Sequence, residues 1–283
     1  LDRGASELAI LGLLFNLQDQ ARAQGGRVHI LLGNHELMNA EHDFRYVTPG
    51  GFAEFSREHP SNPSSKPSDL SRESTSGALS GSLGDGGSGS GGGSPAVTVA
   101  PNSVLESVRN MPAWMRARAL AMRPGGRVSG ILAQRATVAI IVGDNIFVHG
   151  GLRPDHIPDG DASLEAMNSA TRAWLAGKGE KPAVMKGGRS PVWMRNYSRP
   201  IPTPVDCAML ERTLRVVRAK RMIVGHTPQA AGINAACSGK IWRIDTGMSA
   251  AYGGVPEALE ITPNRIRILT PKGARSSASR TRR

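Results

Sequence analysis

The sequence has little cysteine, no long apolar segment and fewer acidic than basic residues. Its 283 residues include two cysteines, Cys207 and Cys237. Two are too few for a disulfide framework, and their spacing does not form a metal-binding pair. No stretch approaches the roughly 20 consecutive apolar residues that cross a bilayer, so we expect no membrane span.

The basic excess gives a net charge of +12. It is spread over the stretches 116–135 and 212–221 and the C-terminal residues 272–283. A positive charge of this size attracts nucleic acid, acidic lipid and phosphorylated partners without specificity. Arginines on helices, however, most often form a solvated face with their apolar stems along the surface. We therefore expect no nucleic-acid partner.

Serine, glycine and proline make up about two thirds of residues 61–94. Such a segment buries too little apolar surface to offset its ordering entropy. We therefore predict one globular domain formed by residues 1–60 and 96–270, with a disordered insert at 61–95. The basic residues 271–283 are predicted to form a disordered tail.

Apolar periodicity and turn residues predict a mixed α/β layout. The sequence Gly143-Asp144-Asn145 is a hairpin signal between two apolar runs. The predicted helices are 6–23 and 205–220, the predicted strands are 27–32, 137–142, 146–148 and 222–224, and a closing β meander takes 240–244, 258–261 and 265–269.

Three apolar runs end in a histidine flanked by glycine. They are Ile30-Leu31-Leu32-Gly33-Asn34-His35-Glu36, Ile146-Phe147-Val148-His149-Gly150-Gly151 and Met222-Ile223-Val224-Gly225-His226-Thr227. Buried parallel strands read as short apolar runs, and ligands gather beyond their carboxyl ends. Imidazole nitrogen with amide or carboxylate oxygen suits Mn, Fe or Zn. The pattern therefore predicts a metal site where three loops converge.

The motifs also resemble a known family. Leu1-Asp2-Arg3-Gly4, Gly33-Asn34-His35-Glu36, His149-Gly150-Gly151-Leu152 and Gly225-His226-Thr227 are similar to the signature blocks of calcineurin-like metallophosphoesterases. Residues 39–47 and Pro191-Val192-Trp193-Met194-Arg195 narrow the resemblance to the Shewanella-like protein phosphatases of bacteria, plants and algae. The resemblance runs from residue 1 to about 262, apart from the insert.

The resemblance implies two divalent metal ions and an in-line attack on phosphorus by a metal-bound hydroxide. It makes Asn34, His149 and His226 the ligands of one metal. The fold it implies is an α/β (α+β) sandwich of two sheets flanked by helices, with the site at one edge.

The resemblance further makes His35 the general acid, with Asp2 bonded to it to keep it cationic, and Arg3 the phosphate clamp. Asp2 and Arg3 are also compatible with an ordinary turn before a helix. Arg45 and Arg195 are candidate second clamps. Arg45 lies between aromatic residues and equally fits a surface cation–π contact.

The family's first block, an aspartate and a histidine two residues apart, and its bridging aspartate would precede Leu1. We therefore expect this chain to lack the N-terminal part of the fold, and to be inactive alone. Any targeting segment would lie in that part. This leaves the compartment open, and we expect a soluble protein of the cytoplasm or chloroplast.

The sequence is compatible with three functions. The first is a protein phosphatase acting on a phosphoprotein, and the second is a phosphoesterase for small molecules such as dinucleoside polyphosphates. The third is a noncatalytic scaffold. Cys237 and Arg243 also have the C-x5-R spacing of phosphatases that use a cysteine thiolate as nucleophile. This hypothesis is disfavoured, because residues 241–244 are predicted to form a strand, so no helix dipole would lower the pKa of the thiol.

Overall fold

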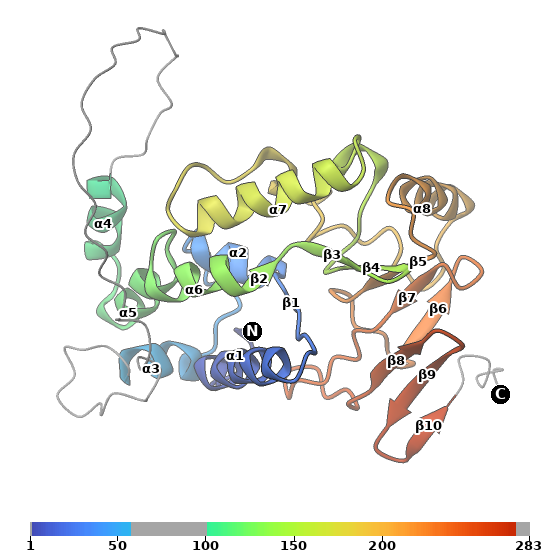
Figure 1. Ribbon diagram of the computed structural model, residues 1–283. Helices are drawn as coiled ribbons and strands as arrows, with labels where there is room; N and C mark the ends of the chain where they lie inside the picture. Colours follow the sequence, from blue (N-terminus) through green and yellow to red (C-terminus); the bar gives the residue numbers. More distant parts are fainter. Residues whose placement is uncertain (1, 58–100, 276–283) are drawn as a thin grey trace, which may run out of the picture.

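The computed structural model describes residues 2–57 and 101–275, a mixed α/β arrangement (Figure 1). The predicted insert at 61–95 lies outside these residues. Within them, no helix is long and apolar enough to cross a membrane. The α-helices are α1 (Glu7–Ala23), α2 (Asn34–Ala40), α3 (Pro49–Arg57), α4 (Pro101–Arg109), α5 (Ala113–Met122), α6 (Arg127–Arg135), α7 (Asp161–Leu175) and α8 (Pro204–Val216), with short 3-10 helices at Pro154–His156 and Ala183–Met185.

The central sheet has five strands in the order β3-β4-β5-β7-β6. The β4, β5 and β7 strands run parallel, whereas β3 and β6 are antiparallel edge strands. The predicted hairpin is present, because β3 and β4 pair antiparallel across Gly143 and Asp144. The bounds are β3 (Ala139–Val142), β4 (Asn145–Val148), β5 (Arg221–Val224), β6 (Asn234–Ala236) and β7 (Ile241–Arg243).

The two faces of this sheet bury different sets of side chains. Met222 and Val224 of β5 join the main core, which α7 and α8 cover (Figure 1). Ile223 points the other way and packs with Trp242 of β7 and Ile268 of β9. This alternation is the two-residue period of a strand buried on both faces.

A three-stranded antiparallel sheet covers the second face, in the order β10-β9-β8. Its strands are β8 (Ala258–Thr262), β9 (Arg265–Thr270) and β10 (Gly273–Arg275). The predicted meander is wrong in one member: residues 241–243 pair parallel with β5 in the central sheet. The predicted tail also begins too early, because Arg275 is in β10 and binds Glu257 at 2.8 Å.

A third, short ladder joins β1 (Ile30–Leu31) to β2 (Ala136–Thr137) in parallel. The described residues thus hold three sheets, where the sequence predicted two in a sandwich. The strand predicted at 27–32 shrinks to two residues because only Ile30 and Leu31 find partners.

The first helix is capped from a distant part of the chain. Ser6 provides no side-chain cap, and the backbone N–H groups of Glu7 and Leu8 donate instead to Glu54 of α3, at 2.8 and 3.0 Å. A carboxylate at a helix N-terminus satisfies unpaired N–H groups and favours the helix dipole. This contact holds α1 and α3 together beside the segment that carries Asp2 and Arg3.

One predicted surface arginine is buried. Arg118 of α5 is 1% exposed and is paired with Glu7 of α1 at 2.7 Å. The solvated face predicted for the arginines of this stretch is therefore wrong for Arg118, because α5 packs on α1, α2 and α3 rather than facing water on that side.

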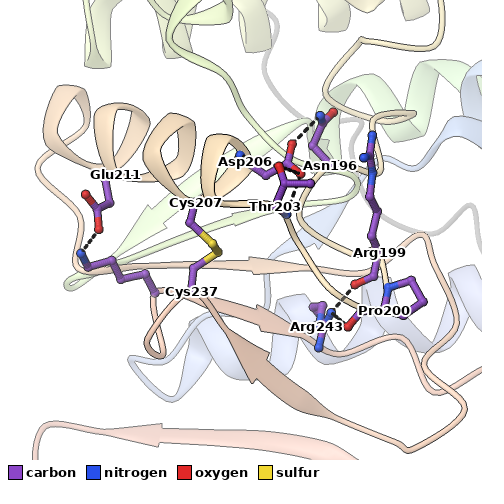
Figure 2. Close-up of a disulfide and its surroundings, with 10 residues drawn as sticks. Asn196, Arg199, Pro200, Thr203, Asp206, Cys207, Glu211, Cys237 and Arg243 are labelled. Atoms are coloured by element: carbon purple, nitrogen blue, oxygen red, sulfur yellow. Dashed lines mark hydrogen bonds and ion pairs between the residues drawn. A yellow bond between two sulfur atoms is a disulfide. The ribbon is translucent and has the colours of Figure 1, made fainter.

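A disulfide joins Cys207 of α8 to Cys237, which follows β6 (Figure 2). It links a helix on one side of the central sheet to the turn before β7. Nearby, Thr203 and Asp206 form a capping box at the start of α8, in which Asp206 N–H donates to Thr203 Oγ1 at 3.1 Å. The helix is thus fixed at its start and by a covalent bond to the sheet.

The disulfide closes a loop with a sequence separation of 30, which on chain-entropy grounds stabilises the fold by about 3.6 kcal/mol. We predict that replacing both Cys207 and Cys237 by serine lowers the melting temperature, measured by calorimetry without reductant. Added reductant should lower the parent to the same value and leave the variant unchanged. Equal melting temperatures of parent and variant would show that the bond contributes no stability.

Candidate active site

Three side chains from separate loops meet at one point. Asn34 is the first residue of α2, His149 follows β4, and His226 follows β5. The Asn34 Oδ1 atom lies 2.9 Å from His149 Nε2 and 3.1 Å from His226 Nδ1, and the two ring nitrogens are 3.1 Å apart. The three polar atoms therefore form a nearly equilateral triangle.

Hydrogen bonds alone satisfy this triangle poorly. An amide oxygen only accepts a hydrogen bond. If both ring nitrogens donated to this one oxygen, their two protons would be crowded close together. A cation resolves the conflict, because lone pairs from all three atoms can face it. For ligand bonds of about 2.1 Å, neighbouring ligands of an octahedral ion lie about 3.0 Å apart. The donor set therefore fits one divalent metal ion.

Both ligand histidines are held neutral. Burial lowers the pKa of His149 to about 4. Burial, reinforced by the charges of His149 and Arg195, lowers the pKa of His226 to about 3. Neutral imidazole is the form that binds metal. Within the described parts of the chain, no three His, Cys, Asp or Glu side chains gather as a metal site, so a metal at this point would need the amide oxygen of Asn34 as its third donor.

Local backbone geometry positions these ligands. Gly33 N–H donates to Glu36 Oε2 at 2.8 Å, which starts α2 at Asn34. His226 has a φ of 65°, in the left-handed region that few residues other than glycine adopt. Gly225 N–H donates to His149 O at 2.9 Å and ties the two histidine loops together. Such strained positions cluster at functional sites.

His35 and Asp2 form a close pair. His35 Nδ1 lies 2.5 Å from Asp2 Oδ1, and Asp2 is 1% exposed. Burial alone would raise the pKa of Asp2, but the hydrogen bond and charge of His35 and the amide of Asn39 outweigh it and lower that pKa. An ionised Asp2 only accepts, so His35 Nδ1 carries a proton and donates it to Asp2, and Nε2 does not take part in this pair.

Arg3 is held between two aromatic rings. Its Cζ atom lies 4.4 Å from the ring centre of Tyr46 and 5.1 Å from that of Tyr252. Tyr46 also contacts the His35 ring, at 5.0 Å between centroids. The Arg3 Nε atom is buried and has no hydrogen-bond partner. A rigid guanidinium with an unused donor is suited to an anion.

These side chains line one pocket of about 310 Å³, here called the histidine pocket. It brings the predicted ligands, His35 and Arg3 together, and Asp2 lies behind His35. The lining residues are Arg3, Asn34, His35, Tyr46, His149, Trp193, Arg195, His226, Asp245, Gly247, Met248, Ser249 and Tyr252.

The two candidate second clamps lie in different places. Arg195 lines the histidine pocket, with its Cζ atom 5.8 Å from the Trp193 ring centre. Arg45 does not line it. Its exposed side chain pairs with Asp43 at 2.7 Å, and that neighbouring carboxylate raises the pKa of Arg45. The structure therefore does not bring Arg45 to the site.

Three residues in or behind the histidine pocket were not predicted from the sequence: Asp245 and Tyr252 line it, and Asn39 lies behind it against Asp2. Asp245 follows β7 as His226 follows β5, so its position at a strand end was a usable signal. Asn39 lies one helical turn after His35, a spacing that puts both on one face of α2. Tyr252 had no such signal, because it is in an irregular loop that returns to the pocket through tertiary packing.

Cys237 is not a nucleophile in this structure. Its sulfur is bonded to Cys207, and the described residues contain no free cysteine. Arg243 instead donates to the backbone carbonyl of Arg199 and, at 3.4 Å, to that of Pro200 (Figure 2). The C-x5-R spacing is a coincidence of sequence.

The chain is similar to proteins of a plant and of a virus. The chain is 39% identical to Shewanella-like protein phosphatase 2 of Arabidopsis thaliana over 95% of its own length and 66% of that protein. It is 27% identical to an uncharacterised protein of Acanthamoeba polyphaga mimivirus, covering 90% of this chain and 97% of that one. No family model matches the chain.

The fold also matches a solved structure. The cold-active protein-tyrosine phosphatase of a psychrophilic Shewanella species aligns with a TM-score of 0.56 at 21% identity, covering 95% of this chain and 64% of that one. The chain therefore shares the fold of this solved structure. The chain belongs to the Shewanella-like protein phosphatase family, and it spans about two thirds of the length of these phosphatases.

We predict that His226→Ala weakens Mn²⁺ binding by more than about tenfold, because it removes one corner of the ligand triangle. Equilibrium dialysis with Mn²⁺ alone measures the effect without any substrate. The control is His29→Gln, which changes an exposed histidine outside the histidine pocket. Equal affinity in the parent and both variants would show that the triangle is not a metal site.

We also predict that Tyr252→Ala weakens inhibition by inorganic phosphate several-fold, whereas Tyr252→Phe does not. Phenylalanine keeps the ring against Arg3 and removes only the hydroxyl, and a cation–π contact is worth about 0.5–2 kcal/mol. The inhibition constant for phosphate is the readout. A similar loss in both variants would place the role in the hydroxyl instead.

Proposed function

We propose that the chain carries the catalytic site of a metal-dependent protein phosphatase, which hydrolyses phosphomonoesters. The observation that supports this most is the ligand triangle of Asn34, His149 and His226 in the same pocket as the His35–Asp2 pair and Arg3. A metal site, a proton donor and an anion clamp are the three parts that phosphomonoester hydrolysis needs.

The proposed roles follow from the contacts of each side chain. Asn34, His149 and His226 would hold one of the two Mn, Fe or Zn ions that the family resemblance implies, and such ions would supply a Lewis acid that activates water. Arg3 binds two phosphoryl oxygens through its planar fork, and the rings of Tyr46 and Tyr252 keep that fork in place. Asp2 accepts from Nδ1–H of a cationic His35, so that Nε2–H faces the ester oxygen and passes its proton to that oxygen as the P–O bond breaks, which leaves His35 neutral.

Arg195 is the proposed second contact for the phosphoryl group. It lines the histidine pocket, and its positive charge reaches His149 and His226, where it contributes to their lowered pKa values. Arg45 is not proposed as a phosphate contact, because its side chain lies outside the pocket and pairs with Asp43.

The rim of the pocket favours an aryl phosphate. Tyr46, Trp193 and Tyr252 are aromatic, and Met248 is 59% exposed beside them. Aromatic rings pair favourably with one another at centroid distances of about 4.5–7 Å. A phosphotyrosine side chain presents such a ring directly behind its phosphate, so we propose a phosphotyrosyl protein as the preferred substrate.

The test is phosphate release from a phosphotyrosine peptide by the full-length gene product, with Mn²⁺ and after chelation. We expect activity only with metal, a lower rate on the matching phosphoserine peptide, and a loss of about 10²–10⁴ in kcat for His35→Asn. The His29→Gln variant is again the control, and Arg45→Ala should leave KM within about twofold of the parent, because exposed ion pairs contribute little.

Activity that persists after chelation, or a fully active His35→Asn variant, would contradict the proposed mechanism. Equal turnover of the two peptides would remove only the preference for phosphotyrosine. Mn²⁺ binding without turnover of either peptide would support a scaffold, and turnover of a dinucleoside polyphosphate alone would support a small-molecule phosphoesterase.

A further inference from the structure

A line of buried polar side chains continues inward from His35. Asp2 accepts from His35 through Oδ1 and from Asn39 Nδ2 through Oδ2, at 2.5 and 2.9 Å. Asn39 Oδ1 then accepts from Arg118 Nε at 2.7 Å. Asn39 and Arg118 are each 1% exposed. A guanidinium that reaches no solvent therefore lies two hydrogen bonds behind the His35–Asp2 pair.

The other nitrogens of Arg118 are also fixed. Its two terminal nitrogens donate to Glu7 Oε1 and Oε2 at 2.9 and 2.7 Å, and one of them also donates to Gly51 O at 3.2 Å. The Cζ atom lies 4.6 Å from the Phe55 ring centre. The bidentate ion pair with Glu7 and the packing against Phe55 together restrict the guanidinium group to one orientation.

That orientation determines the direction of the Asn39 amide. Arg118 Nε can only donate, so the Asn39 atom facing it is the oxygen, and the NH2 group faces Asp2. The same NH2 group donates to His35 O at 2.8 Å, one helical turn earlier. Since Asn39 occupies Oδ2 of Asp2, Oδ1 is left for His35 Nδ1. Arg118 therefore adds a donor on the oxygen side of the amide, while Asp2 Oδ2 and His35 O accept from its NH2 side, so the amide is held from both ends.

We propose that Arg118 is a positioning residue for His35, acting through Asn39 and Asp2. Its effect on turnover rests on the proposed phosphatase function, whereas its effect on the His35 hydrogen bond does not. A purely structural role is the competing explanation, because Arg118 also joins α5 to α1 and α3. A structural defect would reduce turnover of every substrate alike.

The leaving group separates the two explanations. A general acid matters for an ester whose leaving oxygen is basic, such as phenyl phosphate, and matters little for 2,4-dinitrophenyl phosphate, whose phenolate leaves unprotonated. In Arg118→Lys the ammonium still pairs with Glu7 but cannot also donate to Asn39. We expect kcat for phenyl phosphate to fall at least about tenfold, and by no more than the 10²–10⁴ that a general acid contributes in full, and kcat for the dinitrophenyl ester to change less than about twofold.

Asn39→Ala provides an independent route to the same result, should Arg118→Lys not fold. Alanine is a strong helix former and removes the contacts on both sides of the amide. The matched control is Arg135→Lys, since Arg135 forms an exposed pair with Asp19 at 2.8 Å. It should leave both substrates unaffected. Thermal melting identifies the folded variants.

A second readout needs no catalysis. The proton on His35 Nδ1 should give a downfield NMR resonance in the parent, assigned by its loss in His35→Asn. We expect folded Arg118→Lys and Asn39→Ala to weaken or shift this resonance, while Arg135→Lys preserves it. All variants are made in the full-length gene product. Should that parent hydrolyse neither ester with Mn²⁺, the proposed function fails and the resonance alone decides the role of Arg118. Folded variants that retain the parent resonance, or lose turnover equally on both esters, would overturn the proposal.

Discussion

The parallel pairing of β4, β5 and β7 is the constraint on which the histidine pocket depends. Its register sets Val148 beside Val224, and Val224 beside Arg243. All three strands end at the same edge of the sheet, so the residues that follow their carboxyl ends lie close to one another. Parallel strands require crossover connections, and the α7 and α8 regions supply the one between β4 and β5. One covered sheet therefore both forms the core and aligns His149, His226 and Asp245.

The helical side of the pocket depends on buried charge instead of strand register. Burying an arginine costs several kcal/mol unless its partners are well arranged, and a buried pair adds little net stability over apolar residues of similar size. Arg118 and Glu7 are therefore better understood as fixing an arrangement than as strengthening the fold. They connect α5 to α1 beneath Asp2, so both sides of the pocket are held by groups that tolerate little displacement.

The sequence predicted the parts of the site that depend on local order along the chain. The three histidines could be found because each directly follows an apolar strand, and the hairpin at Gly143 could be found from its turn residues. The placement of residues 241–243 could not, because a short apolar strand does not specify its partner. Arg118 escaped notice for a similar reason: nothing in the spacing of arginines on α5 distinguishes the one that faces Glu7 from those that face water. Arg45 is the opposite case. Its position in a motif suggested a phosphate clamp, but in the structure its side chain pairs with the neighbouring Asp43 and lies outside the histidine pocket.

The packing of α3 against α5 brings together the two described ends of the chain around residues 58–100. Phe52 lies edge-on to Trp114 at 4.6 Å between ring centroids, and to Phe44 at 5.7 Å, so the positions on either side of residues 58–100 are brought together by the fold itself. Closing a longer loop between two such anchors costs only about 0.6 kcal/mol for each doubling of its length. A change in the length of the segment between Phe52 and Trp114 would therefore carry little thermodynamic penalty. The same junction is a natural place to introduce an affinity tag or a fluorescent reporter without rebuilding the histidine pocket.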